Sequence, residues 1–68
     1  MGLNNHIKAL RQARGWTQKD LAARLEVSRQ TVIAIENGRY DPSLPLAFVM
    51  SDVFDLRIDE IFYRDENG

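Results

Sequence analysis

The sequence contains no cysteine and only one histidine among its 68 residues. The lack of cysteine excludes disulfide bonds and thiolate zinc sites. His6 has no partner at metal-ligand spacing, so we expect neither a metal nor any other cofactor. No apolar run approaches the ~20 residues of a transmembrane helix, and the first residues, MGLNNHIK, lack the apolar stretch of a signal peptide. We therefore expect a cytoplasmic protein that makes no membrane contact.

The chain is short, which limits both its stability and its chemistry. It has the length of a single domain, residues 1–68, and such a domain buries only ~60% of the surface that it exposes when unfolded. Without disulfide or metal, its stability must come from tight helix packing or from oligomerisation. The sequence offers no nucleophile–base set and no phosphate-binding loop, and there is little room for a pocket. These absences argue against an enzyme.

The sequence also lacks the excess of positive charge that nucleic-acid-binding domains usually carry. It has nine Lys and Arg against ten Asp and Glu, a net charge of −1. The charges are unevenly distributed along the chain. Residues 1–40 carry seven basic and three acidic side chains, whereas residues 41–68 carry two basic and seven acidic side chains. Phosphate attraction acts over a Debye length of ~8 Å. A basic first half is therefore able to bind DNA beside an acidic second half.

Two helix starts lie only eleven residues apart, at Thr17 and Ser28. Hydroxyl side chains cap helix N-termini, and the pattern predicts one helix over residues 18–25 and a second over residues 28–37. Only residues 26–27 separate the two helices. Two short helices joined so tightly must cross steeply, which is the geometry of a helix-turn-helix.

The spacing of apolar residues predicts three further helices, over residues 5–14, 43–54 and 58–62. In the helix over 43–54, the apolar side chains at helical spacing are expected to face the core: Leu46, Val49, Met50, Val53 and Phe54. Residues 61–63 are also able to pair with residues 2–3 as a minor two-stranded β element. The sequence therefore predicts an all-α fold of five helices with, at most, a small terminal sheet.

The first turn of the second helix, residues 28–31, consists of hydrogen-bonding side chains that the core does not need. In a helix-turn-helix the second helix enters the major groove, and its N-terminal residues meet base edges. Arg29 is suited to guanine and Gln30 to adenine, each through two hydrogen bonds, and Ala34, one turn on, is suited to a thymine methyl group. The alternative is that Arg29 and Gln30 form only a solvated first turn.

Candidate phosphate contacts lie at both ends of this helical unit. Gln18 opens the first helix, where free N–H groups and the positive end of the dipole favour an anion, and Ser28 opens the second. Asn37, Arg39 and Tyr40 follow the second helix and are placed to approach phosphates from the loop. Plainer roles are the alternatives: Gln18 as a solvent-facing residue, Asn37 as part of the helix end, and Arg39 as surface charge.

Arg11 and Glu36 carry opposite charges in two helices that are expected to pack together. Arg11 follows the core residue Leu10, and Glu36 follows the core residue Ile35. The two charges should therefore flank the contact between their helices and form an ion pair that fixes one helix against the other. The alternative is two unrelated surface charges.

Five motifs cover nearly the whole chain: Trp16-Thr17-Gln18, Val27-Ser28-Arg29-Gln30-Thr31-Val32, Ile35-Glu36-Asn37-Gly38-Arg39-Tyr40, Pro42-Ser43-Leu44-Pro45-Leu46-Ala47 and Asp59-Glu60-Ile61-Phe62. Together they resemble the Cro/repressor-type (Xre) family of helix-turn-helix regulators, above all its small single-domain members. The resemblance implies a five-helix fold, operator binding as a homodimer and control of transcription, with repression as the expected mode. It also implies base contacts from Arg29, Gln30 and Ala34, phosphate contacts from Gln18, Asn37 and the 39–40 loop, and an Arg11–Glu36 pair.

The chain departs from this family at two positions. The family usually has glycine in the helix-turn-helix turn, where this chain has Glu26, and after the fourth helix, where it has Asp55. A left-handed conformation strains a residue that has a Cβ by ~1–2 kcal/mol, and Asp tolerates it better than Glu. We therefore expect either strain or a reshaped turn at Glu26.

A homodimer is expected on geometric grounds as well. One recognition helix reads too few base pairs to be selective in a genome, whereas a two-fold dimer presents two such helices about one DNA turn, ~34 Å, apart. Surplus apolar residues near the C-terminus are the candidates for the dimer interface: Leu56, Ile61, Phe62 and Tyr63. Their alternative role is to close the core of the monomer.

Sequence-specific binding of double-stranded DNA is the function that these features predict. A second interpretation is an antitoxin or anti-repressor, a protein-interaction module whose acidic second half holds a partner protein. The uneven distribution of charge motivates this interpretation. The two functions are compatible in one chain.

Overall fold

The computed structural model describes residues 3–64, which form five α-helices and a two-stranded sheet. In chain order the elements are β1 (Leu3–Asn5), α1 (Ile7–Ala13), α2 (Gln18–Leu25), α3 (Arg29–Glu36), α4 (Leu44–Phe54), α5 (Ile58–Ile61) and β2 (Phe62–Arg64). Within the described residues, the predicted helical fold with a small terminal sheet is confirmed. α1 is shorter than the predicted range of 5–14, because residue 5 belongs to β1, and α5 ends before Phe62.

Local hydrogen bonds fix where α2 and α3 begin. Thr17 Oγ1 accepts the N–H of Asp20 at 3.0 Å, and the Asp20 carboxylate accepts the N–H of Thr17 at 2.9 Å, a complete capping box. Ser28 Oγ accepts the N–H of Thr31 at 3.1 Å. Both helix starts are where the sequence predicts them, and α2 spans the predicted residues 18–25.

The turn between α2 and α3 passes through a left-handed residue. Glu26 has φ 60° and ψ 40°, and Asp55, which ends α4, has φ 57°. The turn is not reshaped, since it keeps the conformation that a glycine adopts most easily. Glu26 is therefore strained, because its Cβ approaches the carbonyl oxygen that follows it in this region.

Every helix contributes to one hydrophobic core. Among the described residues, eleven apolar side chains are buried: Ile7, Leu21, Ala22, Leu25, Val32, Ile35, Ala47, Met50, Phe54, Ile61 and Phe62. Trp16 packs against this core from the loop before α2, with its ring centroid 5.8 Å from that of Phe54. In a domain with no disulfide, this shared core is what holds the helices at fixed angles.

α4 uses only one of its faces for the core. It packs against α2 and α5 through the side that carries Ala47, Met50 and Phe54. The prediction that Val49 faces the core is wrong, because Val49 is 39% exposed. Consecutive residues are ~100° apart around a helix, which takes Val49 to the border of the outer face.

The sheet joins the two ends of the described chain in an antiparallel pair. Asn4 lies opposite Tyr63 and Asn5 opposite Phe62. The predicted pairing of residues 61–63 with 2–3 is therefore shifted, and Gly2 lies outside the described residues. The shift arises because Ile61 ends α5 with its side chain in the core, so β2 begins only at Phe62.

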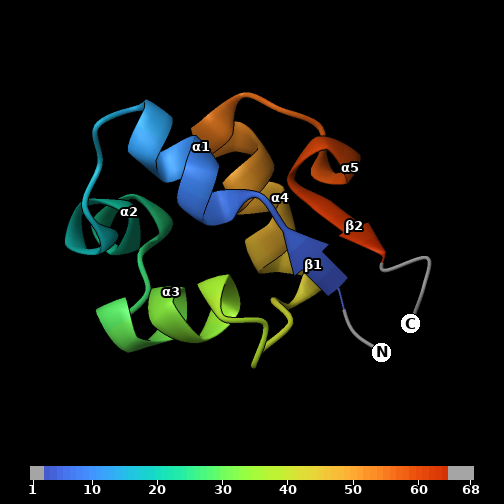
Figure 1. Ribbon diagram of the computed structural model, residues 1–68, viewed down its shortest axis with the longest axis horizontal. Helices are drawn as coiled ribbons and strands as arrows, with labels where there is room; N and C mark the ends of the chain where they lie inside the picture. The colour runs from blue at the N-terminus through green and yellow to red at the C-terminus, as the bar shows by residue number, and fades with distance from the viewer. Residues whose placement is uncertain (1–2, 65–68) are drawn as a thin grey trace.

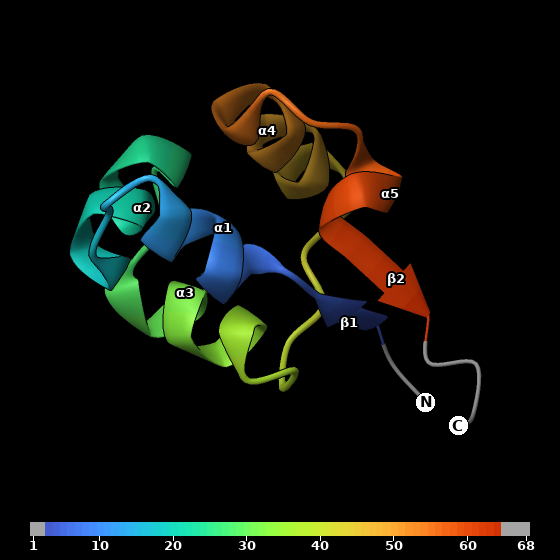
Figure 2. The ribbon, with the colours of Figure 1, turned by 45° about the horizontal axis from the view of Figure 1, so that its top comes forward.

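The arrangement of the helices leaves α3 at one edge of the molecule. Figure 1 shows α3 along the lower edge, below α1, with the sheet at the end away from α2. Figure 2 shows α4 on a different side of the molecule from α3. Within residues 3–64, every helix is too short or too polar to cross a membrane.

Candidate nucleic-acid interface

The first turn of α3 stands in solvent with its polar side chains outward. Ser28, Arg29 and Gln30 are exposed, and Ala34 is half-buried one turn later. The Ser28 hydroxyl is engaged in the cap of α3, where it also lies 3.0 Å from Thr31 Oγ1. Arg29 and Gln30 are therefore the exposed side chains of this turn that take no part in its cap.

A shallow depression joins the start of α3 to the start of α2. It is lined by residues from the end of α1 through the first turn of α2, and by one residue of α3: Arg11, Gly15, Trp16, Thr17, Gln18, Lys19 and Arg29. Gln18, predicted from the sequence as a phosphate contact, and Arg29, predicted as a base contact, thus line the same depression. Two basic side chains, Lys19 and Arg29, are exposed around it.

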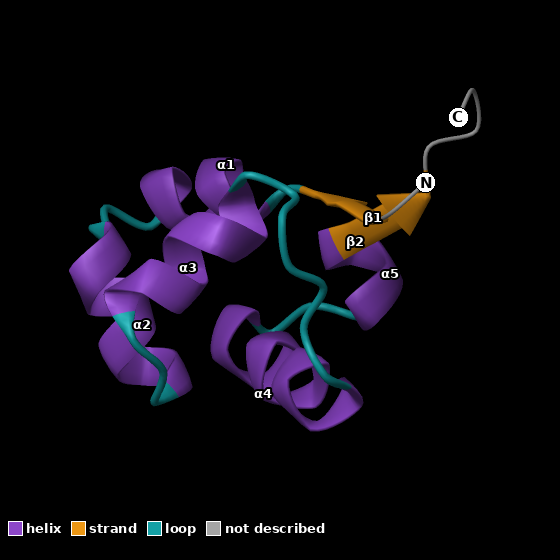
Figure 3. Cartoon of the chain, turned by 90° about the horizontal axis from the view of Figure 1, so that it is seen from below, coloured by secondary structure: helices purple, strands orange, loops and turns teal. Residues whose placement is uncertain are grey.

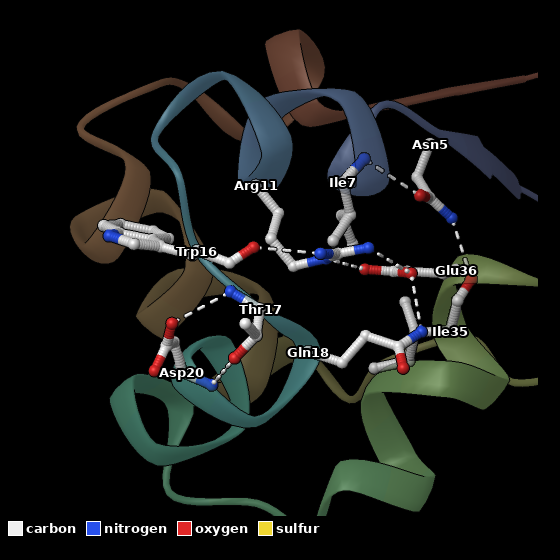
Figure 4. A network of polar contacts seen from close by, with 9 residues as sticks. All are labelled: Asn5, Ile7, Arg11, Trp16, Thr17, Gln18, Asp20, Ile35 and Glu36. Atoms are coloured by element: carbon white, nitrogen blue, oxygen red, sulfur yellow. Dashed lines mark hydrogen bonds and ion pairs between the residues drawn. The ribbon is translucent and has the colours of Figure 1, made fainter.

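An ion pair joins α1 to α3 (Figure 4), and its Arg11 also lines this depression. Arg11 Nε donates to Glu36 Oε2 at 2.7 Å, and Arg11 Nη2 donates to Glu36 Oε1 at 3.3 Å. The two side chains are only 9% and 4% exposed. Arg11 Nη1 also donates to the backbone carbonyl of Trp16 at 2.9 Å. The predicted partners therefore meet in a bidentate pair that ties α1 to α3 and to the loop before α2.

Gln18 joins the same network, which the sequence pattern does not predict. Its Nε2 atom donates to Glu36 Oε1 at 3.3 Å (Figure 4). The Gln18 side chain is consequently half-buried and held toward α3. A single carboxylate, that of Glu36, therefore fixes both the start of α2 and the body of α1 relative to α3.

The end of α3 is organised by backbone bonds. Asn37 is the C-cap residue, and the N–H of Arg39 donates to the carbonyl of Ala34 at 2.9 Å. Asn37, Arg39 and Tyr40 are all exposed in the loop that follows. Asn5 Nδ2 donates to the carbonyl of Ile35 at 2.9 Å, an anchor from β1 that the sequence pattern does not reveal. Three of the predicted phosphate contacts, Asn37, Arg39 and Tyr40, thus follow the C-terminal end of α3.

Other arginines of the basic half are held against the body of the protein. The Arg24 guanidinium lies 4.2 Å from the centroid of the Trp16 ring. Arg14 lies 5.1 Å from the Phe54 ring and donates to the Phe54 carbonyl at 2.8 Å. These contacts fix the aromatic cluster, and they make Trp16 a reporter of folding.

The helix-turn-helix family model matches residues 7–61, a range that includes all five helices. The chain belongs to this helix-turn-helix family. It is a small helix-turn-helix transcriptional regulator of the Xre type that its motifs resemble, and such regulators are DNA-binding proteins.

Two relatives of this helix-turn-helix regulator match it over nearly their whole length. An uncharacterized HTH-type transcriptional regulator of Methanocaldococcus jannaschii is 51% identical over 94% of the chain and 98% of the relative. The uncharacterized HTH-type transcriptional regulator YgzD of Bacillus subtilis is 39% identical over 97% of the chain and 100% of the relative. The competence pilus inhibition repressor of Acinetobacter baylyi is 28% identical over 98% of the chain and 61% of its own length.

Two of the four residues predicted for the dimer interface are buried in the core of the monomer. Ile61 is 0% and Phe62 is 7% exposed, because both side chains close the core beneath the sheet. Leu56 is half-buried and packs against the same core, and Tyr63 stacks on the His6 ring with the centroids 4.6 Å apart. Ile61 and Phe62 therefore take the alternative role of closing the monomer core, and Tyr63, which is 45% exposed, is the residue of the four that lies at the surface.

Proposed function

We propose that this regulator binds a palindromic operator in double-stranded DNA as a homodimer and represses transcription there. The observation that carries the proposal is the exposed first turn of α3, at the edge of the molecule and beside the basic depression of Gln18, Lys19 and Arg29. A helix presented at an edge by its N-terminal residues suits insertion into the major groove.

Within the groove, Arg29 donates to guanine O6 and N7, and Gln30 bonds adenine N6 and N7. Ala34, half-buried one turn on, offers only a methyl group and suits a thymine methyl. Each bidentate pair contributes ~1–3 kcal/mol of discrimination against the wrong base. Three such positions specify only a few base pairs, so a second copy of the protein has to supply the rest of the site.

Phosphate contacts at the two ends of α3 hold it in register. Gln18 and Ser28 approach the backbone on one side, and Asn37, Arg39 and Tyr40 approach it on the other. The bonds of Glu36 to Arg11 and Gln18 support this role, because they fix the start of α2 relative to the reading helix before DNA arrives. Preorganised contacts of this kind reduce the ordering cost of binding.

The proposal is tested by selecting binding sites from random duplex DNA. We expect an enriched palindrome whose two half-sites are centred about one helical turn, ~34 Å, apart. Arg39→Ala should weaken binding to all sequences alike and reduce the salt dependence, since it removes a phosphate contact. Arg57→Ala is the matched control, because Arg57 is also exposed but bonds Asp59 in the acidic half. Selection that enriches no sequence would contradict the proposal.

A second candidate function rests on the acidic half of the chain. Residues 41–68 carry seven acidic side chains against two basic ones. A shallow depression there is lined by three of the acidic residues and one of the basic ones: Asp52, Asp55, Glu60 and Arg57. Such a surface suits a basic partner protein. Pull-down from the native host with and without nuclease separates the two functions, since a protein partner survives nuclease and a DNA-mediated one does not.

A further inference from the structure

The outer face of α4 is more apolar than the rest of the described surface. Five large apolar side chains in residues 4–64 are exposed, and three of them lie on this one helix: Leu44 at 67%, Phe48 at 56% and Val49 at 39%. Phe48 lies about 160° around the helix from the core residue Met50. It therefore marks the centre of the outer face, one turn after Leu44.

We infer that this α4 face is the surface through which two copies of the chain meet. The inference deepens the proposed function and rests on it, since it names the contact that joins the two halves of the operator-binding dimer. It replaces the interface expected at Ile61 and Phe62, whose side chains are buried within the monomer.

The charges of α4 support a second copy as the occupant. Residues 44–51 carry no charge, and Asp52 is the charged residue of the helix. In an antiparallel pair with Phe48 at the two-fold axis, Leu44 of one copy lies opposite Asp52 of the other. Each Asp52 carboxylate then faces the N-terminal end of the partner's α4, where the helix dipole favours negative charge. No like charges meet at the centre.

The position of α4 also suits a DNA-binding dimer. Figure 3 looks onto the edge that α3 forms, and α4 lies to one side of α3 in that view. The outer face of α4 is turned away from α2 and α5, against which its inner face packs. A two-fold axis that passes alongside α4 and is perpendicular to the plane of Figure 3 leaves the α3 helices of both copies facing the viewer. That arrangement lets two recognition helices reach one face of a duplex.

The size of the face predicts a weak dimer. A standard interface buries ~800 Å² per partner, about a sixth of the 4759 Å² that the chain exposes. α4 has eleven residues and is therefore only ~16 Å long. One face of such a helix falls short of the standard area, so we expect roughly micromolar self-association that binding to two adjoining half-sites reinforces.

Sedimentation equilibrium over a wide concentration range tests the inference. The wild-type chain should form dimers, and Phe48→Glu should weaken the dimer by ~100-fold or more, because it places two like charges at the axis. Tyr63→Glu is the matched control, since Tyr63 is an aromatic residue of similar exposure, 45%, on β2. Trp16 fluorescence and thermal unfolding verify that each variant is folded.

A cysteine cross-link provides a second, independent readout. The chain has no cysteine, so Phe48→Cys introduces a single thiol close to its symmetry mate. Under mild oxidation this variant should become a covalent dimer that still binds the full palindrome, whereas Tyr63→Cys should remain uncross-linked. A wild-type chain that stays monomeric alone, a Phe48→Glu variant that dimerises normally, or a Phe48→Cys variant that does not cross-link contradicts the inference. If the wild-type chain stays monomeric, the outer face of α4 instead binds a different protein.

DNA binding distinguishes this inference from the proposed function. If both hold, Phe48→Glu binds an isolated half-site like wild type and loses affinity only for the full palindrome. If the α4 contact is wrong but the function is right, the variant binds the palindrome as tightly as wild type. If the function is wrong but the contact is right, Phe48→Glu breaks the dimer although no DNA site is selected.

Discussion

Removal of the Glu36 side chain should be among the most destabilising single changes in the chain. Glu36→Ala leaves the Arg11 guanidinium, whose side chain is 9% exposed, without its carboxylate partner. Breaking one side of a buried pair typically costs ~3–5 kcal/mol. The whole domain should be stable by only ~3–10 kcal/mol, from ~0.05–0.15 kcal/mol per residue. We therefore expect Glu36→Ala to be marginally folded or unfolded at room temperature.

Urea unfolding followed by Trp16 fluorescence measures this cost, with circular dichroism as the second probe. The double variant Arg11→Met with Glu36→Leu is the decisive control, because replacing a buried pair by apolar residues is often neutral or stabilising. It should be much more stable than Glu36→Ala, although it gives up the Arg11 bond to the Trp16 carbonyl and the Gln18 bond to Glu36. A cost below ~1 kcal/mol for Glu36→Ala, the range of an exposed pair, would contradict the burial of the Arg11–Glu36 pair.

Three further changes have defined outcomes. Glu26→Gly relieves the backbone strain at φ 60°. The ~1–2 kcal/mol of left-handed strain that is removed outweighs the ~0.5–1 kcal/mol entropic cost of glycine. The midpoint of thermal unfolding should therefore rise by a few degrees, and an unchanged or lower midpoint contradicts this prediction. Hydrogen bonds from the backbone and side chain of Thr17 lower the pKa of Asp20 below 3.8. The stability that Asp20 contributes to the folded state is therefore present above pH 3.8, and it is lost as the pH falls through the lowered pKa of the folded state. Asp20→Ala should therefore reduce the acid dependence of unfolding, and identical acid profiles would count against the capping box. Gln18→Ala should weaken binding to every DNA sequence by a similar factor in gel-shift titrations; a change in sequence preference would show that Gln18 reads bases.

The sequence predicts the helix-turn-helix well because its signals are local. Thr17, Ser28 and Ser43 each cap a helix through a bond to a residue three positions on, so spacing alone locates the helix starts. The strained position at Glu26 is likewise a property of a short turn. Such contacts depend on neighbours in the chain, and a single sequence contains all of them.

Contacts between distant residues are where the sequence prediction is incomplete or wrong. The bonds of Gln18 to Glu36 and of Asn5 to Ile35 join residues 18 and 30 positions apart, and polar side chains give no periodic signal of such partners. Ile61 and Phe62 are apolar residues whose burial depends on how the sheet closes over the core. Apolar character alone does not distinguish a core position from an interface position.

Base reading by the first turn of α3 is tested by site selection with Arg29→Ala. Selected in parallel with the wild-type chain on random duplex DNA, the variant should lose its preference for guanine at one position of each half-site. It should retain the remaining positions and the spacing of the palindrome, because Gln30, Ala34 and the phosphate contacts are unchanged. An unaltered motif, or a uniform loss of binding without any change of preference, would contradict the account.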